Sequence, residues 1–189
     1  VARMALYTVQ VDPDAAPAPA HVLEKHFQRK HGLSETGVAD EATQRALFSS
    51  AAQESEEYVF PYKIYVDISD QYVYVFGWDG ESYSIKERKM ICSTGKDDTP
   101  TPTGTYQAYA QLSGEWYWFK QYQCYAKWAY GIVGGILFHS VTFNRNKKQV
   151  GSESNLGRKA SHGCIRLKID DAKWIYDNCP YGTTVVIQE

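Results

Sequence analysis

Metal-binding cysteine patterns are missing from this chain of 189 residues. Its four cysteines form no Cys-x-x-Cys pair and show no cysteine and histidine spacing of the kind that binds zinc. We therefore expect no metal site. We expect Cys92, Cys124 and Cys179 to be small buried apolar residues, because free cysteine is among the most buried residue types.

The chain also lacks an excess of charge and a long apolar run. Lysine and arginine number 20 against 22 aspartates and glutamates, a net charge of -2, which gives no general attraction for nucleic acid or an anionic membrane. The apolar stretch 132–138 is far shorter than the roughly 20 residues of a membrane-spanning helix. Because the chain begins at Val1, we expect a fragment of a longer precursor, and any membrane contact would come through an anchor outside it.

Aromatic residues are abundant instead. They make up 14% of the chain and include 15 tyrosines, which favour strands and binding clefts over bundled helices. The length suits one domain of about 130 residues with a smaller module beside it. The composition therefore predicts a mainly β fold.

Residues 1–50 predict a small helical module. Three prolines place residues 12–20 in a loop. Apolar residues at helical spacing predict a helix over 21–30 that ends near Gly32, and Asp40 is suited to cap a second helix over 41–48. The polar residues 51–57 are suited to a linker.

The sequence predicts a β domain over residues 58–189, because apolar residues there recur at every second position instead of at helical spacing. Residues 62–67 and 72–76 alternate like the strands of a hairpin. Two prolines place segment 99–104 in a surface loop. Further strands are expected over 85–92, 104–112, 116–126, 136–141 and 183–187, with one helix over 170–178.

The motif Ser161-His162-Gly163-Cys164 carries the candidate chemistry, together with His139 upstream. A thiol is only a few per cent ionised at neutral pH, so a cysteine nucleophile needs a base, and either imidazole could serve. Gly163 lets the backbone bend so that N–H groups near Gly163 and Cys164 could bind an oxyanion. Taken singly, each histidine is more often structural, but the combination favours an acyl-transfer enzyme.

The same motif resembles the signature of the bacterial L,D-transpeptidases with a YkuD-type catalytic domain. Two further segments are similar: Cys92-Ser93-Thr94-Gly95-Lys96 with Thr101-Pro102-Thr103-Gly104, and 171–176 followed by Gly182-Thr183-Thr184-Val185. The resemblance covers residues 58–189 and implies a β-sandwich with one or two short helices. The resemblance further implies that the domain needs no cofactor and acts on the tetrapeptide stems of peptidoglycan.

The resemblance also implies roles for the motif residues. Cys164 would attack the carbonyl of the third stem residue and expel D-alanine, and an amine of a second stem would resolve the thioester into a 3→3 cross-link. His139 would be the general base, followed by Ser140 as in the family, and Ser161 and His162 would shape the site, although the two histidines could exchange roles. Water as acceptor would give a carboxypeptidase, and an inactive wall-binding protein is the third alternative.

Two features depart from the common family pattern. Arg166 stands where some members carry asparagine, and its guanidinium suits either a substrate carboxylate or a local partner such as Asp170. The 21 residues 140–160 form a longer spacer than in many members, which we expect to extend a loop at the cleft. The dense aromatic segment 116–130 is expected in the core, with some residues available for a lid.

The helical module resembles the second half of a three-helix peptidoglycan-binding domain, through residues 27–33 and 36–47. It could equally be a spacer. The family resemblance implies an extracytoplasmic location in the cell envelope, where a disulfide from Cys124 to Cys92 or Cys179 stays open.

Overall fold

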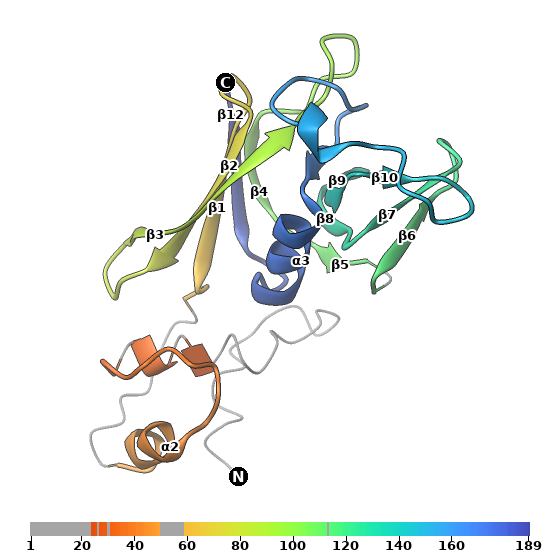
Figure 1. The fold of residues 1–189 in the computed structure, drawn as a ribbon. Helices are drawn as coiled ribbons and strands as arrows, with labels where there is room; N and C mark the ends of the chain where they lie inside the picture. Colours follow the sequence, from red (N-terminus) through yellow and green to blue (C-terminus); the bar gives the residue numbers. More distant parts are fainter. Residues whose placement is uncertain (1–23, 26, 30, 50–58, 113) are drawn as a thin grey trace.

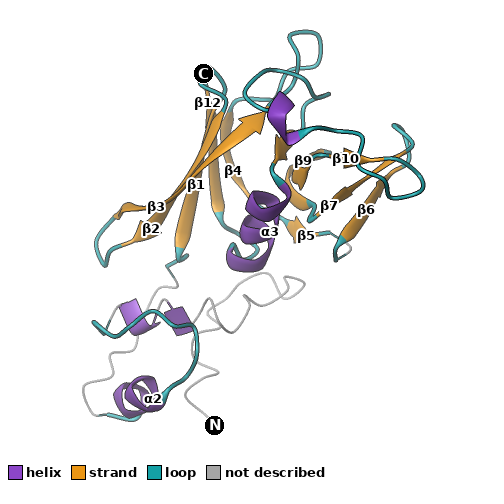
Figure 2. Ribbon diagram, viewed as in Figure 1, coloured by secondary structure: helices purple, strands orange, loops and turns teal. Residues whose placement is uncertain are grey.

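The polypeptide is mainly β, as the composition and the family resemblance predict (Figure 1). A computed structural model describes residues 24–25, 27–29, 31–49, 59–112 and 114–189. Strands dominate the described part, with a few short helices (Figure 2). The predicted linker 51–57 and the loop 12–20 lie outside the described residues.

Two sheets form the β domain. The larger has nine strands in the order β4-β12-β1-β2-β3-β11-β9-β8-β5, and the smaller has the order β10-β7-β6. The larger sheet contains β1 (Tyr62–Asp67), β2 (Tyr72–Trp78), β3 (Tyr83–Ser93), β4 (Gly104–Gln107), β5 (Ala110–Gln111), β8 (Tyr130–Val133), β9 (Ile136–Ser140), β11 (Ile165–Leu167) and β12 (Thr184–Gln188). The smaller contains β6 (Trp116–Phe119), β7 (Cys124–Lys127) and β10 (Thr142–Phe143).

The core follows from the period-two alternation of these strands. In β1 every second residue is buried, so Ile64 and Val66 face inward while their neighbours are partly exposed. The helix α3 (Ile169–Asn178) adds Ala172 and Ile175 to the same cluster and packs on β7, β9 and β11. The only other short helix of the described β domain is the 3-10 turn η2 (Glu153–Asn155).

The parallel pair β9 and β11 positions the candidate site. Ile165 pairs with Phe138 and Leu167 with Ser140, and Phe138, Ile165 and Leu167 are fully buried in the core. Alternation therefore turns the neighbouring residues of both strands toward the opposite side.

Several strands differ from the prediction. The expected strand 116–126 is a hairpin of β6 and β7, whose turn at 120–123 contains no glycine or proline; Gln123 adopts a positive φ of 51° there. The expected strand 104–112 is broken between β4 and β5 at the buried Ala108. The three-residue β11 and the strand β8 were not predicted, because their sequences are too short to show a period.

The described helical residues fit the predicted module. Asp40 caps α2 (Glu41–Leu47) by accepting a hydrogen bond from the N–H of Thr43 at 2.9 Å, as predicted. Of the expected helix over 21–30, the residues described are helical and the rest lie outside the description. Arg29 joins this module to the β domain by donating to the carbonyl of Trp78 at 3.1 Å. None of the described helices is long and apolar enough to cross a membrane.

Candidate active site

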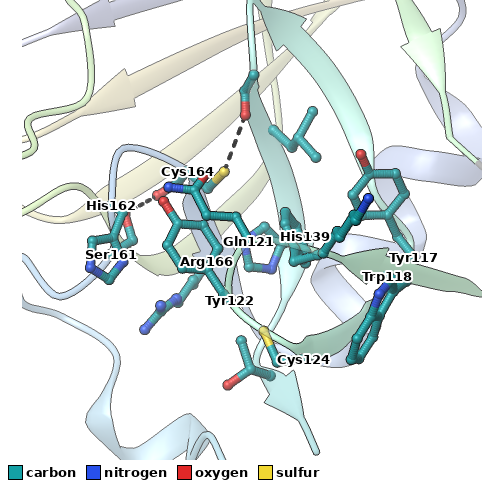
Figure 3. A pocket seen from close by; sticks show the side chains of 15 residues that line it. Tyr117, Trp118, Gln121, Tyr122, Cys124, His139, Ser161, His162, Cys164 and Arg166 are labelled. Carbon is teal, nitrogen blue, oxygen red and sulfur yellow. Dashed lines mark hydrogen bonds between the residues drawn. The ribbon is translucent and has the colours of Figure 1, made fainter. Parts of the chain in front are cut away.

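A cavity of about 400 Å³ lies between the pair β9 and β11 and the hairpin of β6 and β7 (Figure 3). It brings together five residues that the sequence singles out, from segments far apart in the chain. These are His139, Ser161, His162, Cys164 and Arg166. The other lining residues are Tyr117, Trp118, Phe119, Lys120, Gln121, Tyr122, Cys124, Gly135, Leu137 and Thr142.

Cys164 immediately precedes β11, and its sulfur faces the cavity. The Sγ atom donates a hydrogen bond to the carbonyl of Gly135 at 3.6 Å, drawn as a dashed line in Figure 3. Burial raises the pKa of this thiol above its usual value, while a hydrogen bond from the backbone of Leu137 and the charge of Arg166 act in the opposite direction. The resting cysteine is therefore a neutral thiol at neutral pH.

His139 is buried in β9, and its ring has a defined proton position. Its Nδ1 atom lies 2.6 Å from the backbone oxygen of Ser140. Because a carbonyl oxygen only accepts, Nδ1 carries the proton and Nε2 keeps a free lone pair. Burial lowers the pKa of His139 to about 4, so the imidazole is a neutral base over the physiological range.

The turn before Cys164 depends on Gly163. Its φ of +109° disfavours any side chain, and a Cβ there would lie 2.7 Å from Cδ1 of Ile136. Its N–H donates to Oγ of Ser161 at 3.0 Å, and this hydroxyl donates to the carbonyl of Cys164 at 2.5 Å. The Gly163 N–H, expected as an oxyanion donor, is thus already occupied within the turn.

Buried polar groups support this turn from below. Thr101 donates to the carbonyl of Gly163 at 2.7 Å and accepts from the N–H of Gly95 at 2.8 Å. The N–H of Ser161 donates to the carbonyl of Thr94 at 3.0 Å. Thr101 is only 4% exposed, so the proline-containing segment 99–104 is not wholly the surface loop that its sequence predicts.

Ser140 lies on the side of β9 that faces away from the cavity and is not among the lining residues. Its hydroxyl accepts from the N–H of Lys127 at 2.8 Å and donates to the carbonyl of Val141 at 2.7 Å. The side chain of Ser140 therefore joins β9 to the end of β7. The backbone carbonyl of Ser140 holds the His139 ring through Nδ1. Its contribution to the site is positional.

Arg166 enters the cavity wall two residues after Cys164 on the same face of the chain. One Nη atom donates to the carbonyl of Ala160 at 3.3 Å, whereas the buried Nε has no hydrogen-bond partner. Within the described residues Arg166 forms no ion pair, so Asp170 is not the partner that the sequence left open.

The hairpin supplies the residues that sequence reasoning left unassigned. Tyr122 at its turn stacks on the exposed ring of His162, with centroids 4.8 Å apart and an interplanar angle of 20°. Phe119 packs 4.9 Å from the ring of His139. The alternating aromatics indicated a strand, but nothing in them indicated which side of the strand meets the cavity.

The long spacer supports this hairpin from outside. Of the residues 140–160, all described, Thr142 alone lines the cavity. Lys147 instead places its Nζ 4.8 Å from the ring of Trp116 in β6. The spacer therefore braces the hairpin more than it extends the cleft.

All four cysteines lie in the described residues, and none forms a disulfide. Cys92 and Cys179 are buried, as expected, but Cys124 is half-buried and lines the cavity. Among the described residues no group of three or more histidine, cysteine, aspartate or glutamate side chains could hold a metal ion.

Known proteins share both the fold and the sequence of this domain. An L,D-transpeptidase from Mycobacterium smegmatis has a TM-score of 0.56 at 26% identity, over 69% of this chain and 59% of that chain, which is less than two thirds of its length. A fused Zn-dependent amidase/peptidase and peptidoglycan-binding-domain protein from Clostridium acetobutylicum has a TM-score of 0.57 at 25% identity, over 99% and 92%. Fold and site thus define an L,D-transpeptidase-type domain.

The sequence comparison gives the family. Residues 61–187 match the YkuD family, the L,D-transpeptidase catalytic domain. A Bacillus subtilis protein with the name "Putative L,D-transpeptidase YciB" is 39% identical over 141 residues, 65% of this chain and 69% of that protein. The chain belongs to the YkuD family, which confirms the resemblance carried by the Ser161 to Cys164 motif.

Proposed function

We propose that this chain forms 3→3 cross-links between peptidoglycan stems through a thioester on Cys164. The observation that carries the proposal is the shared cavity of Cys164 and His139, in which Nδ1 of His139 is held by a carbonyl and Nε2 is free to accept a proton. Arg166 is proposed to bind a carboxylate of the donor stem. We further propose that the reaction takes place in the cell envelope, where peptidoglycan is found.

The proposed acylation begins from a neutral pair. Nε2 of His139 takes the proton of the Cys164 thiol as the sulfur attacks the carbonyl carbon of the third stem residue. The tetrahedral intermediate collapses by breaking the C–N bond to the terminal D-alanine, whose nitrogen receives the proton from His139. A thioester and free D-alanine result.

The second half of the proposed reaction returns the enzyme to its starting state. A neutral side-chain amine of an acceptor stem attacks the thioester carbon and passes a proton to His139. The C–S bond then breaks, and the proton returns to the sulfur of Cys164. The new amide bond is the 3→3 cross-link, whereas attack by water would give a free tripeptide.

The proposal is tested by mass spectrometry of the protein after incubation with a disaccharide-tetrapeptide. Release of D-alanine, an acyl adduct on the protein and a cross-linked dimer are expected. Cys164→Ala should lose all three products by at least about 10³-fold, while Cys124→Ala, which removes the other thiol of the cavity, should keep the adduct. Free tripeptide without a dimer would contradict transpeptidation in favour of a carboxypeptidase. Wall binding without turnover would indicate an inactive binder.

A further inference from the structure

The cavity wall is cationic. Its 15 lining residues include Lys120 and Arg166, and no aspartate or glutamate is among them. His139 is neutral, because burial keeps its pKa at about 4. The permanent charges that face this cavity are therefore positive.

Within the described part of the chain, neither of these two cations takes part in an ion pair. Lys127, on the same hairpin, shows the contrast, because its Nζ lies 2.8 Å from a carboxylate oxygen of Glu115. The side chain of Arg166 is half-buried, and among the described residues its one hydrogen bond goes from an Nη atom to the carbonyl of Ala160. An anionic ligand in the cavity would offer the Nη atoms a charged acceptor.

The two cations come from opposite walls of the cavity. Arg166 belongs to β11, two residues from the nucleophile, and its charge acts on the Cys164 thiol. Lys120 belongs to the turn of the β6 and β7 hairpin and is exposed. One small carboxylate next to Arg166 would leave Lys120 for a second anionic group of the same ligand.

We propose that Lys120 is a specificity-determining residue for donor stems that carry a second carboxyl group besides the C-terminal one, here called the side carboxyl group. Lys120 would select stems in which this group is ionised over stems in which it is a carboxamide. The terminal carboxylate of the stem is assigned to Arg166, and the side carboxylate to Lys120. This inference rests on the proposed function. A carboxamide keeps the shape of the carboxylate but removes its charge, so amidation isolates the electrostatic contribution.

The test compares two donor tetrapeptides that differ only in amidation of the side carboxyl group. For the unmodified protein we expect kcat/KM for D-alanine release to be about two- to fivefold higher with the ionised donor, the size of an exposed ion pair. Lys120→Gln should bring this ratio close to one, and Lys120→Arg should restore it. Lys148→Gln removes the same charge from an exposed site away from the cavity and should leave the ratio unchanged.

A binding measurement separates this inference from the proposed chemistry. In Cys164→Ala, isothermal titration calorimetry measures the Kd of each donor without turnover. Equal Kd values for the two donors, or an unchanged preference in Lys120→Gln, would overturn the selection by Lys120 and leave transpeptidation intact. Preferential binding of the ionised donor by a protein that releases no D-alanine would overturn the proposed function while the charge selection stands.

Discussion

The first wall of the cavity, formed by β9, β11 and the turn before Cys164, is held by hydrogen bonds to buried groups. The tip of the second wall, the hairpin of β6 and β7, meets the first wall through rings. Gly163 is fixed by a hydroxyl of the buried Thr101 at 2.7 Å. At the tip of the hairpin, Tyr122 is 43% exposed and contacts the first wall by stacking on His162. A hydrogen bond fixes a direction, while stacked rings can slide.

This difference assigns separate tasks to the two walls. The proposed proton transfer needs atoms held within about 0.5 Å, which buried hydrogen bonds provide. Selection among stems needs a surface that adapts to the ligand, and the hairpin with Lys120 and Tyr122 fits that need. Changes in the first wall should therefore affect the chemical step or the stability, and changes in the hairpin should affect KM.

The largest effect is expected from the base in the first wall. His139→Asn should lower kcat by about 10²- to 10⁴-fold, because a carbonyl holds Nδ1 of His139 and leaves Nε2 as the proposed acceptor of the thiol proton. The measurement is D-alanine release from the tetrapeptide at saturating donor. The matched variant His162→Asn should retain most of kcat. If His162→Asn showed the larger loss, the roles of the two histidines would be exchanged.

The buried His139 should also make stability depend on pH. Its pKa falls from 6.5 to about 4 on folding, so below pH 6.5 the unfolded chain binds a proton that the folded protein excludes. Between pH 7 and 4 the free energy of unfolding should therefore decrease by roughly 3 kcal/mol more than in His139→Asn. Urea unfolding at both pH values measures this difference. Equal pH dependence in the two proteins would show that His139 titrates normally.

Removing the support under the catalytic turn should cost stability directly. Thr101→Val leaves the N–H of Gly95 and the carbonyl of Gly163 without their partner, which should destabilise the domain by about 1 to 3 kcal/mol. Urea unfolding checks the value. Thr103→Val on the exposed part of the same segment should change the free energy by less than about 0.5 kcal/mol, and equal effects would refute the role assigned to Thr101.

The smallest effect is expected at the hairpin. Tyr122→Ala should change the free energy of unfolding by less than about 0.5 kcal/mol, since the side chain is exposed at the tip of the hairpin and outside the core. The KM for the donor should rise by about two- to fivefold, as expected for the loss of one ring contact, while kcat stays nearly constant. Tyr122→Phe retains the stacked ring and should keep the original KM. A fall in kcat with unchanged KM would place Tyr122 with the chemistry.

The sequence predicts the first wall far better than the second. Local chemistry singles out Cys164 and Gly163 as candidates, because a cysteine beside a flexible turn leaves a short motif, and the structure brings both to the cavity or its supporting turn. Asp40 is found for the same reason, since capping depends on the next three residues. The partner of the Gly163 carbonyl was not predictable, because Thr101 lies 62 residues away in the sequence. The prolines beside Thr101 indicate only a loop.

The hairpin was missed for a different physical reason. Its alternating aromatics continue on both sides of the turn, and Gln123 adopts a positive φ without the glycine that usually marks such a position. The role proposed for Lys120 depends on the absence of a neighbouring acid, a property of the folded cavity and not of the local sequence. The sequence left Arg166 either a substrate carboxylate or Asp170 as its partner. Only the folded structure shows that Arg166 and Asp170 form no ion pair.

The position of β12 has a consequence for the order of folding. This last strand lies between β1 and β4, pairing in parallel with the first strand of the domain and antiparallel with β4. Both neighbours keep open edges until Thr184–Gln188 arrives. A ribosome must therefore release nearly the whole domain before the sheet can close, and a chain cut short by a few residues would expose two edges that invite association with other chains.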